Sequence, residues 1–493
     1  QGWTVDDLLR RHPELTGLTL GMRSDGRVVA EPVPSSLNPM HPLSGKLYAE
    51  SFFGQFERHC PGEAGRGLNF FFSDELGFGV GGNLWSAGFA REFQRRKGYD
   101  ITPELPALFK DIGPRTPKVR LDYRDVMVSL SEEGFFKPCF DWHQQRGMIF
   151  GCDHGGRGRN VVEFGDYFRT QRWNQGPGAD QPHLGKDLIK AKVAASIAHL
   201  YGRPRVWLEG FYGSGWGTTS AGLVDATFAN YAMGFNLLGL HGMYYSTHGG
   251  WWEWAPPDNT FRMPYWPHLR GFMDCQQRLA YLLSQGDHRC DVAILYPVAP
   301  VEADLGGKEA VAAAFDTARA IHAKGIDFDF MDFESLDRAA IAGPELRVSG
   351  EIYRVLILPG MRAIRHSTLT KAAAFKRAGG VVLAVGALPE ASDRAGRDDP
   401  EVAALVKELF PNGATADAVA AIPFRDYEGP GIALHRRIGP RDIYAIYGAP
   451  RGAPCRFRAT GRAELWDPWA GGVRPLPVAE QDGTHTRLDL PLS

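Results

Sequence analysis

The feature that most constrains the fold is an alternation, between about residues 66 and 245, of short hydrophobic runs with longer amphipathic stretches. Residues 188–200 have the spacing of apolar side chains that is typical of a helix. Four of the short runs have the composition of buried strands: 67–75, 148–154, 205–209 and 235–241. Because strands that alternate with helices form βα units, this pattern predicts a parallel sheet.

Polar or ionisable side chains end every one of these runs. In a closed barrel of βα units, the carboxyl ends of the strands form the active-site face. The pattern therefore predicts a TIM-type (β/α)8 barrel with a catalytic face. The side chains at the strand ends are Asp74, Glu75, Asp153, His154, Glu209 and His241. The runs number fewer than eight, so we expect the first strands to lie before Gln1 or to come from elsewhere, with 37–40 as a candidate loop after one of them.

Two further units follow the barrel pattern. Strand-like runs at 291–297, 353–359 and 380–385 alternate with helical stretches and predict an open, flavodoxin-like α/β domain. No G-x-G-x-x-G motif follows the first of these strands, which argues against a dinucleotide. From about residue 417 the pattern changes to short strands with turns, which favours a small β-sandwich. The predicted boundaries are 1–288 for the partial barrel, 289–400 for the α/β domain and 401–493 for the β-rich domain.

Composition narrows the classes of partner. The chain has 55 basic and 57 acidic residues with no basic run, which argues against nucleic acid and anionic membrane surfaces. Apolar segments stay shorter than about 18 residues, so no transmembrane helix is expected. The six cysteines lie far apart without a C-x-x-C pair, which favours free thiols over a zinc site or a disulfide framework. Since the sequence starts at Gln1, periplasmic, secreted and cytoplasmic locations all stay open.

An aromatic segment at 241–266 is the clearest candidate for contact with a sugar. It contains eight aromatic residues among Gly, Pro and polar residues, and it fits neither helical nor strand periodicity. Aromatic faces stack on the C–H faces of sugar rings, while polar side chains bind the hydroxyls. The candidates here are Tyr245, Trp251, Trp252 and Arg262. The alternative is a Trp-rich loop packed over the end of the barrel.

Glu209 is the candidate proton donor. Glycoside hydrolysis needs two carboxyl groups, and one of them must be protonated. Aromatic neighbours such as Trp207 and Phe211 favour the protonated form, because an apolar setting raises a carboxyl pKa. A structural ion pair is the alternative role for this residue. For the second carboxylate Glu253 is favoured, and the other candidates are Asp153, Asp74 and Glu75. These last three, with His154, could instead bind sugar hydroxyls or a hard cation such as calcium.

The order of segments resembles glycoside hydrolase family 106, the α-L-rhamnosidase family. The resemblance is carried by five segments: 92–100 followed by 105–108, the strand-end Glu209, 240–242, 278–286 opening into 291–297, and 465–472. It implies a barrel, an inverting mechanism with Glu as acid and as base, and calcium near the bound sugar. Glu209 falls where the acid-bearing strand of the family lies. The second Glu cannot be aligned, so Glu253 depends on the residue argument alone.

Three functions are therefore compatible with the sequence. The first is an inverting, exo-acting α-L-rhamnosidase on plant or microbial glycans. The second is a retaining β-galactosidase-like hydrolase; in such enzymes a similar middle α/β domain assists oligomer formation, which leaves a homo-oligomer open. The third is a carbohydrate-binding protein without catalytic activity, although a pure binder has little need of ionisable groups at successive strand ends.

Overall fold

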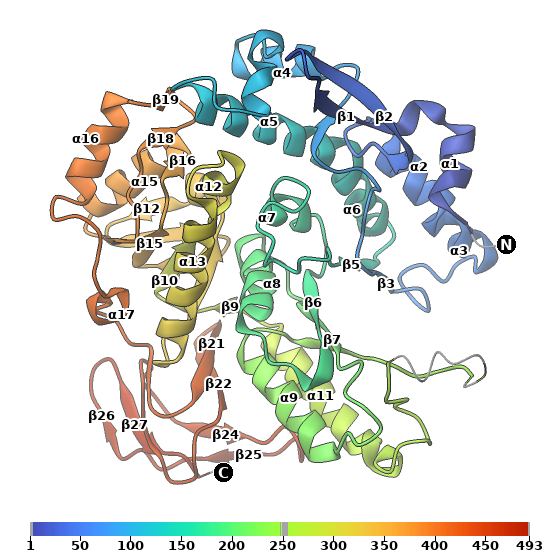
Figure 1. Ribbon diagram of the computed structural model, residues 1–493. Helices are drawn as coiled ribbons and strands as arrows, with labels where there is room; N and C mark the ends of the chain where they lie inside the picture. The colour runs from blue at the N-terminus through green and yellow to red at the C-terminus, as the bar shows by residue number, and fades with distance from the viewer. Residues whose placement is uncertain (1–2, 247, 249–254, 492–493) are drawn as a thin grey trace.

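The computed structural model describes residues 3–246, 248 and 255–491, and it has a mixed α/β fold (Figure 1). Five short parallel strands form the part that carries the candidate site. β3 (Phe70–Ser73) pairs with β5 (Ile149–Cys152), and β6 (Gly178–Gln181), β7 (Trp207–Gly210) and β8 (Leu237–Leu240) pair in that order. Helices α7 (Tyr167–Gln171), α8 (Leu188–Leu200), α9 (Ser220–Ala232) and α11 (Leu269–Leu283) follow β5, β6, β7 and β8 in turn. The predicted βα units are confirmed.

One of these strands, β6, escapes sequence analysis. Its four residues, Gly178–Gln181, contain no large hydrophobic side chain, and prolines stand on both sides of it. A Cβ at Gly178 would lie 2.3 Å from the Trp207 ring, so the close packing of β6 against β7 requires a glycine there. The hydrophobic signal of this pair of strands therefore lies in β7 alone.

The amino-terminal part differs from the prediction. Between residues 3 and 69, which the structure describes, no strand pairs in parallel with β3; β1 (Thr16–Met22) pairs with β2 (Val28–Leu37) and with β4 (Asn83–Trp85) in an antiparallel sheet. The turn between β1 and β2 is held by Arg27, whose backbone N–H donates to the Asp25 carboxylate. Segment 37–40 thus follows an antiparallel strand. Within the described residues the parallel strands form sheets of two and three strands, so a closed eight-stranded barrel is not present.

The second unit is an open parallel sheet, as predicted. Its strand order is β11 (Phe328–Met331), β10 (Val292–Leu295), β15 (Val355–Pro359), β17 (Val381–Val385). Helices α13 (Gly307–His322) and α15 (His366–Arg377) contact the sheet, and α16 (Pro400–Leu409) packs on α15. The strands read as continuous hydrophobic runs because both faces of the sheet are covered.

The third unit consists of antiparallel strands. β20 (Tyr427–Glu428), β23 (Pro454–Phe457), β27 (Thr486–Asp489) and β26 (Glu480–Gln481) form one sheet, and β21 (Ile432–Ile438) pairs with β22 (Arg441–Tyr447) and β9 (Asp287–His288) in another. Side chains from both sheets share one small core. Because β9 precedes the second unit, the third unit joins the end of the first.

Helix α8 connects the first two units. Its residues Ile189, Val193 and Ile197 belong to the same hydrophobic core as the strands of the second unit. Figure 1 shows α8 beside β6, on the side that faces β10 and α13. The second unit therefore supports the parallel strands from behind. No helix in the described ranges is long and apolar enough to cross a membrane.

Candidate active site

Ionisable side chains gather at the carboxyl ends of the five parallel strands. Asp180 and Glu209 are direct neighbours in the register of β6 and β7, so their side chains lie on the same face of the sheet. Asp74 and Glu75 follow β3, Asp153 follows β5 and His241 follows β8. The structure thus brings together all the strand-end residues of the prediction except His154, and it adds Asp180.

Glu209 has the environment of a proton donor. Its side chain is 15% exposed, and Trp207, two residues earlier on the same face of β7, is buried against Phe72 with ring centroids 4.8 Å apart. Burial first, and then the negative charges of Asp74, Asp153 and Asp180, raise the pKa of Glu209 to about 8. The carboxyl group is therefore mainly protonated at neutral pH and can donate that proton.

The imidazole of His241 lies next to the Glu209 carboxyl group. Its Nε2 lies 4.0 Å from Glu209 Oε1, and its ring centroid lies 5.5 Å from that of Tyr212. Burial lowers the pKa of His241, which favours the neutral imidazole. A neutral imidazole has one N–H donor and one acceptor nitrogen, so His241 can bind a sugar hydroxyl.

Three of the acids are tied to cations. The guanidinium of Arg157 contacts Glu75 (2.8 Å), Asp153 (3.1 Å) and Asp180 (2.5 Å). Lys190 Nζ lies 2.6 Å from Asp180, and the Tyr212 hydroxyl donates to the other Asp180 oxygen at 2.7 Å.

Asp153 is fully buried and also accepts from the backbone N–H of Glu75. The carboxylates of Asp153 and Asp180 are thus engaged in holding the site together.

Asp74 differs from these acids. It is exposed, and within the described residues it makes no hydrogen bond or ion pair. Neighbouring atoms still cover part of its carboxyl group, and this partial burial and then the charge of Glu75 raise the pKa of Asp74. Glu75 is also exposed but pairs with Arg157, so among the described acids at the strand ends Asp74 is the exposed one for which no partner is found.

His154 lies outside the open face, contrary to the prediction. It is 1% exposed, and its ring packs on Phe164 and Tyr167 with centroids 4.5 and 5.5 Å away. Its Nε2 pairs with Thr170 Oγ1 at 3.1 Å, and burial lowers its pKa to about 3. A side chain this buried cannot contact a sugar. The prediction for His154 came from its position after Asp153 at a strand end, which does not reveal that the side chain points into the core.

The aromatic segment is described in part. Trp251, Trp252 and Glu253 lie outside the described residues, and their predicted roles stay predictions. Tyr245 is fully exposed, as expected of a platform for a ligand. Arg262 forms an ion pair with the buried Asp258, and its guanidinium lies 4.6 Å from the Phe261 ring centroid. Because Asp258 also accepts from the Tyr244 N–H, Arg262 helps to hold the segment.

Sequence reasoning missed Arg157, Lys190 and Asp180. Their contacts join different strands and loops: Arg157 reaches Glu75, which is 82 residues away, and Lys190 of α8 reaches Asp180 of β6. Of these three residues, Arg157 alone could have been found from the sequence, because it lies in the glycine-containing segment 155–158, two residues after Asp153. Such a segment is typical of a loop at a functional site.

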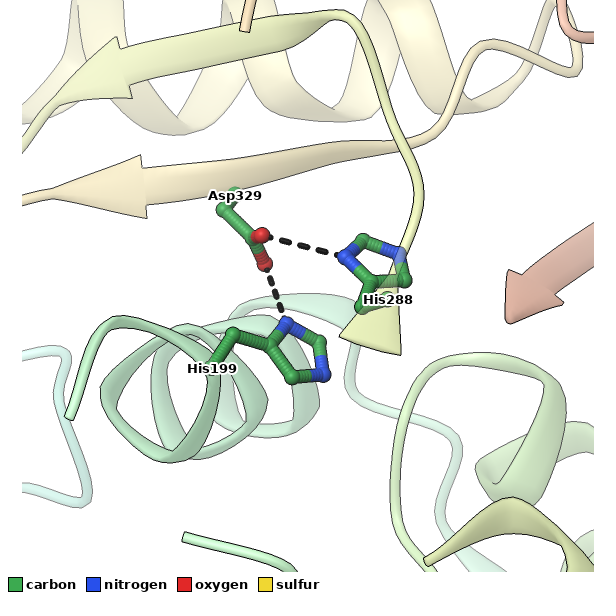
Figure 2. A group of neighbouring side chains, drawn as sticks. All are labelled: His199, His288 and Asp329. Atoms are coloured by element: carbon green, nitrogen blue, oxygen red, sulfur yellow. Dashed lines mark hydrogen bonds and ion pairs between the residues drawn. The ribbon is translucent and has the colours of Figure 1, made fainter. Parts of the chain in front are cut away.

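One group within the described ranges could hold a metal ion. His199 on α8, His288 on β9 and Asp329 on β11 each offer a ligand atom within 4.8 Å of the others (Figure 2). Asp329 accepts from both imidazoles, at 2.9 and 3.1 Å. Two nitrogen ligands and one carboxylate suit zinc or a similar metal, whereas calcium takes oxygen ligands. His199 lies near the end of the helix that follows β6, so this group is near the amino ends of the strands, away from Glu209.

Comparison with known proteins gives the class. The profile of family 106, described as alpha-L-rhamnosidase, matches residues 40–424. The structure of a rhamnosidase from Novosphingobium sp. PP1Y superimposes with a TM-score of 0.75 at 21% identity, over 97% of this chain and 48% of that one. A β-galactosidase from Bacillus circulans sp. alkalophilus gives a TM-score of 0.55 at 12% identity, over 98% of this chain and 87% of that one. The fold therefore resembles that of glycosidases with TIM-barrel catalytic domains.

A curated relative agrees with this class. A protein of Formosa agariphila named "Putative beta-glucuronidase" is 26% identical over 451 residues, which is 84% of this chain and 36% of that protein. Because the family profile covers most of its length, the chain belongs to glycoside hydrolase family 106. It spans about a third (36%) of the curated relative and about half (48%) of the Novosphingobium rhamnosidase.

Calcium near the sugar, which the family resemblance implies, does not fit the described donors. The space between the carboxylates of Glu75, Asp153 and Asp180 is taken by the guanidinium of Arg157. A guanidinium has N–H donors and no acceptor, so it cannot share these oxygens with a metal ion at the same point.

Proposed function

We propose that the protein is an inverting, exo-acting α-L-rhamnosidase in which Glu209 protonates the leaving oxygen. The observation that carries this proposal is a buried carboxyl group with a pKa of about 8 at the end of β7, in a chain of family 106. Family membership implies a carbohydrate substrate, and the protonated carboxyl supplies the acid that glycoside cleavage needs.

The second carboxylate has to activate water on the opposite face of the sugar. Burial raises the pKa of Asp153 to about 7, but Asp153 and Asp180 are both enclosed and paired with cations, so water has little access to their oxygens. Glu253, in the aromatic segment, stays our first choice for the base. Asp74 is the alternative among the described residues, because its carboxylate is exposed. For an inverting enzyme the base should lie about 6.5–9.5 Å from Glu209, against about 5–5.5 Å for a retaining one.

The test is hydrolysis of p-nitrophenyl glycosides by the wild type and by Glu209→Gln. The panel contains α-L-rhamnoside, β-D-galactoside and β-D-glucuronide. We expect the wild type to cleave the α-L-rhamnoside and the variant to be slower by at least about a hundredfold, as for a removed general acid. Proton NMR of the first-formed sugar should show the anomer of inverted configuration. Cleavage of another sugar alone would refute the substrate, and equal rates in both proteins would refute the role of Glu209.

A further inference from the structure

Arg157 occupies the centre of the acidic site. Its guanidinium meets carboxylates from the ends of three strands: Glu75 after β3, Asp153 after β5 and Asp180 on β6. One of its remaining N–H groups donates to the Gly155 carbonyl at 2.8 Å. The side chain is 13% exposed, so water screens these contacts only in part. Two separate parallel sheets, β3–β5 and β6–β7–β8, are thereby joined by one cation.

Hydrogen bonds hold the backbone on both sides of Arg157. Arg157 itself is left-handed, with φ of 44°, and its N–H donates to the His154 carbonyl at 2.9 Å. The carbonyl of the next residue, Gly158, accepts from the Tyr296 hydroxyl of the second unit at 2.6 Å. Left-handed backbone is costly for a residue with a Cβ, so it persists only where surrounding contacts impose it. Contacts from the first and the second unit thus fix the backbone position from which the Arg157 guanidinium extends.

The charges show what the guanidinium does. Buried carboxylates repel one another and need a positive partner at their centre. A hard divalent cation with oxygen ligands is one solution, and a guanidinium with its planar fork of N–H donors is another. Asp153 and Asp180, which are buried, have the second, and the more exposed Glu75 pairs with the same guanidinium. Lys190 supplies a further positive charge to Asp180 from the first turn of α8.

We propose that Arg157 is the resident cation of this site and positions the strand-end acids beside Glu209 in place of a calcium ion. This inference adds a positioning residue to the proposed glycosidase and rests on that function for its activity readout. It predicts that sugar binding and cleavage by this chain do not require calcium. It also predicts that the acids become available to a divalent cation only when the guanidinium is removed.

The test compares Arg157→Met with Arg159→Met and Arg157→Lys. Arg159 is a matched control, because it is a more exposed arginine two residues away whose ion pair is with Asp187, outside the acidic centre. Each protein is treated with a chelator, and then the melting temperature and the heat of binding are measured during titration with calcium chloride. We expect no calcium effect on the wild type or on Arg159→Met, and a calcium-dependent rise in the melting temperature of Arg157→Met.

Activity gives the second readout. We expect kcat/KM of Arg157→Met to fall about a hundredfold, as for reacting groups displaced by about 1 Å. Arg157→Lys should recover part of this loss, and Arg159→Met should resemble the wild type. The alkaline limb of the pH profile should move to higher pH in Arg157→Met, because Glu209 loses a positive neighbour; a purely structural role would not move it.

Three results would overturn the proposal: calcium binding to the chelator-treated wild type, no calcium effect on Arg157→Met, or equal activity in the two methionine variants. The calcium titration needs no substrate. It therefore tests Arg157 even if the panel of glycosides shows that the proposed function is wrong.

Discussion

At the scale of the residue, the chemistry depends on how the environment divides the carboxyl groups. Glu209 is buried beside aromatic rings and stays protonated, whereas Asp153 and Asp180 are held by Arg157 and Lys190. The sequence predicts the first assignment, because Trp207 and Phe211 are its neighbours in the chain. It does not predict the second, because the contacts of Arg157 join strands that lie far apart in the sequence.

We predict that the protonation of Glu209 sets the pH dependence of glycoside cleavage. Its pKa is raised from 4.5 to about 8, so the active, protonated form is present below about pH 8 and is lost above it. We expect log kcat/KM to fall by about one unit for each pH unit above 8, since kcat/KM reports the free enzyme. The measurement is the rate of aryl glycoside hydrolysis between about pH 5 and 10. A profile whose alkaline limb begins near pH 5 would show that Glu209 is not buried in this way.

At the scale of the element, short strands place the acids and the loop after β5 arranges them. Strands β3, β5, β7 and β8 are predictable, because each is a hydrophobic run that ends in polar residues. Strand β6 is not, since Gly178 must be small to pack on Trp207 and no hydrophobic run remains to mark it. The antiparallel sheet at the amino terminus is also not predictable from the βα pattern, which begins after it. The segment with Glu253 stays a prediction.

The loop after β5 offers a prediction at this scale. Gly158 has φ of 78°, and a Cβ there would lie 2.5 Å from Val193 of α8. Gly147 has φ of 64° but open space around it, so it is a control for backbone strain alone. We expect Gly147→Ala to cost about 1–2 kcal/mol from the left-handed backbone. Gly158→Ala should cost more and should lower kcat/KM about tenfold, because the clash displaces Arg157.

Urea unfolding and aryl glycoside hydrolysis check both variants. Equal losses of stability in the two, with unchanged activity in Gly158→Ala, would show that the packing of this loop on α8 does not position Arg157.

At the scale of the whole molecule, the second unit packs against the unit that carries the five parallel strands. Helix α8 contributes residues to the hydrophobic cores of both units. Arg365 makes a second link, between the second unit and the chain before β5. Its guanidinium donates to the Leu121 carbonyl of α5 (Thr116–Ser131) at 3.0 Å and to Glu302 of α12 (Val298–Glu302) at 2.6 Å. The sequence predicts both units, because most of their strands are hydrophobic runs, with β6 as the exception. It does not predict this contact, which joins residues more than two hundred positions apart.

Removing the charge at this junction should destabilise the protein strongly. Arg365 and Glu302 are 4% and 1% exposed, whereas Arg377 and Glu408 form a pair at the same distance of 2.6 Å that is 59% and 41% exposed. We expect Arg365→Met to lower the free energy of unfolding by about 3–5 kcal/mol, because Glu302 is left buried without a partner. Arg377→Met should have little effect, since water screens an exposed pair. Similar urea midpoints for the two variants would contradict this account of the junction.

The central claim, that Glu209 is the proton donor, is tested most directly by the effect of the leaving group. Hydrolysis of 2,4-dinitrophenyl and methyl α-L-rhamnosides is measured with the wild type and with Glu209→Gln. Dinitrophenolate is a stable anion and can leave without a proton, whereas the methoxy group has to be protonated to leave as methanol. The account predicts that the variant cleaves the first substrate within about tenfold of the wild-type rate and loses at least about a hundredfold on the second. An equal loss on both substrates would contradict it.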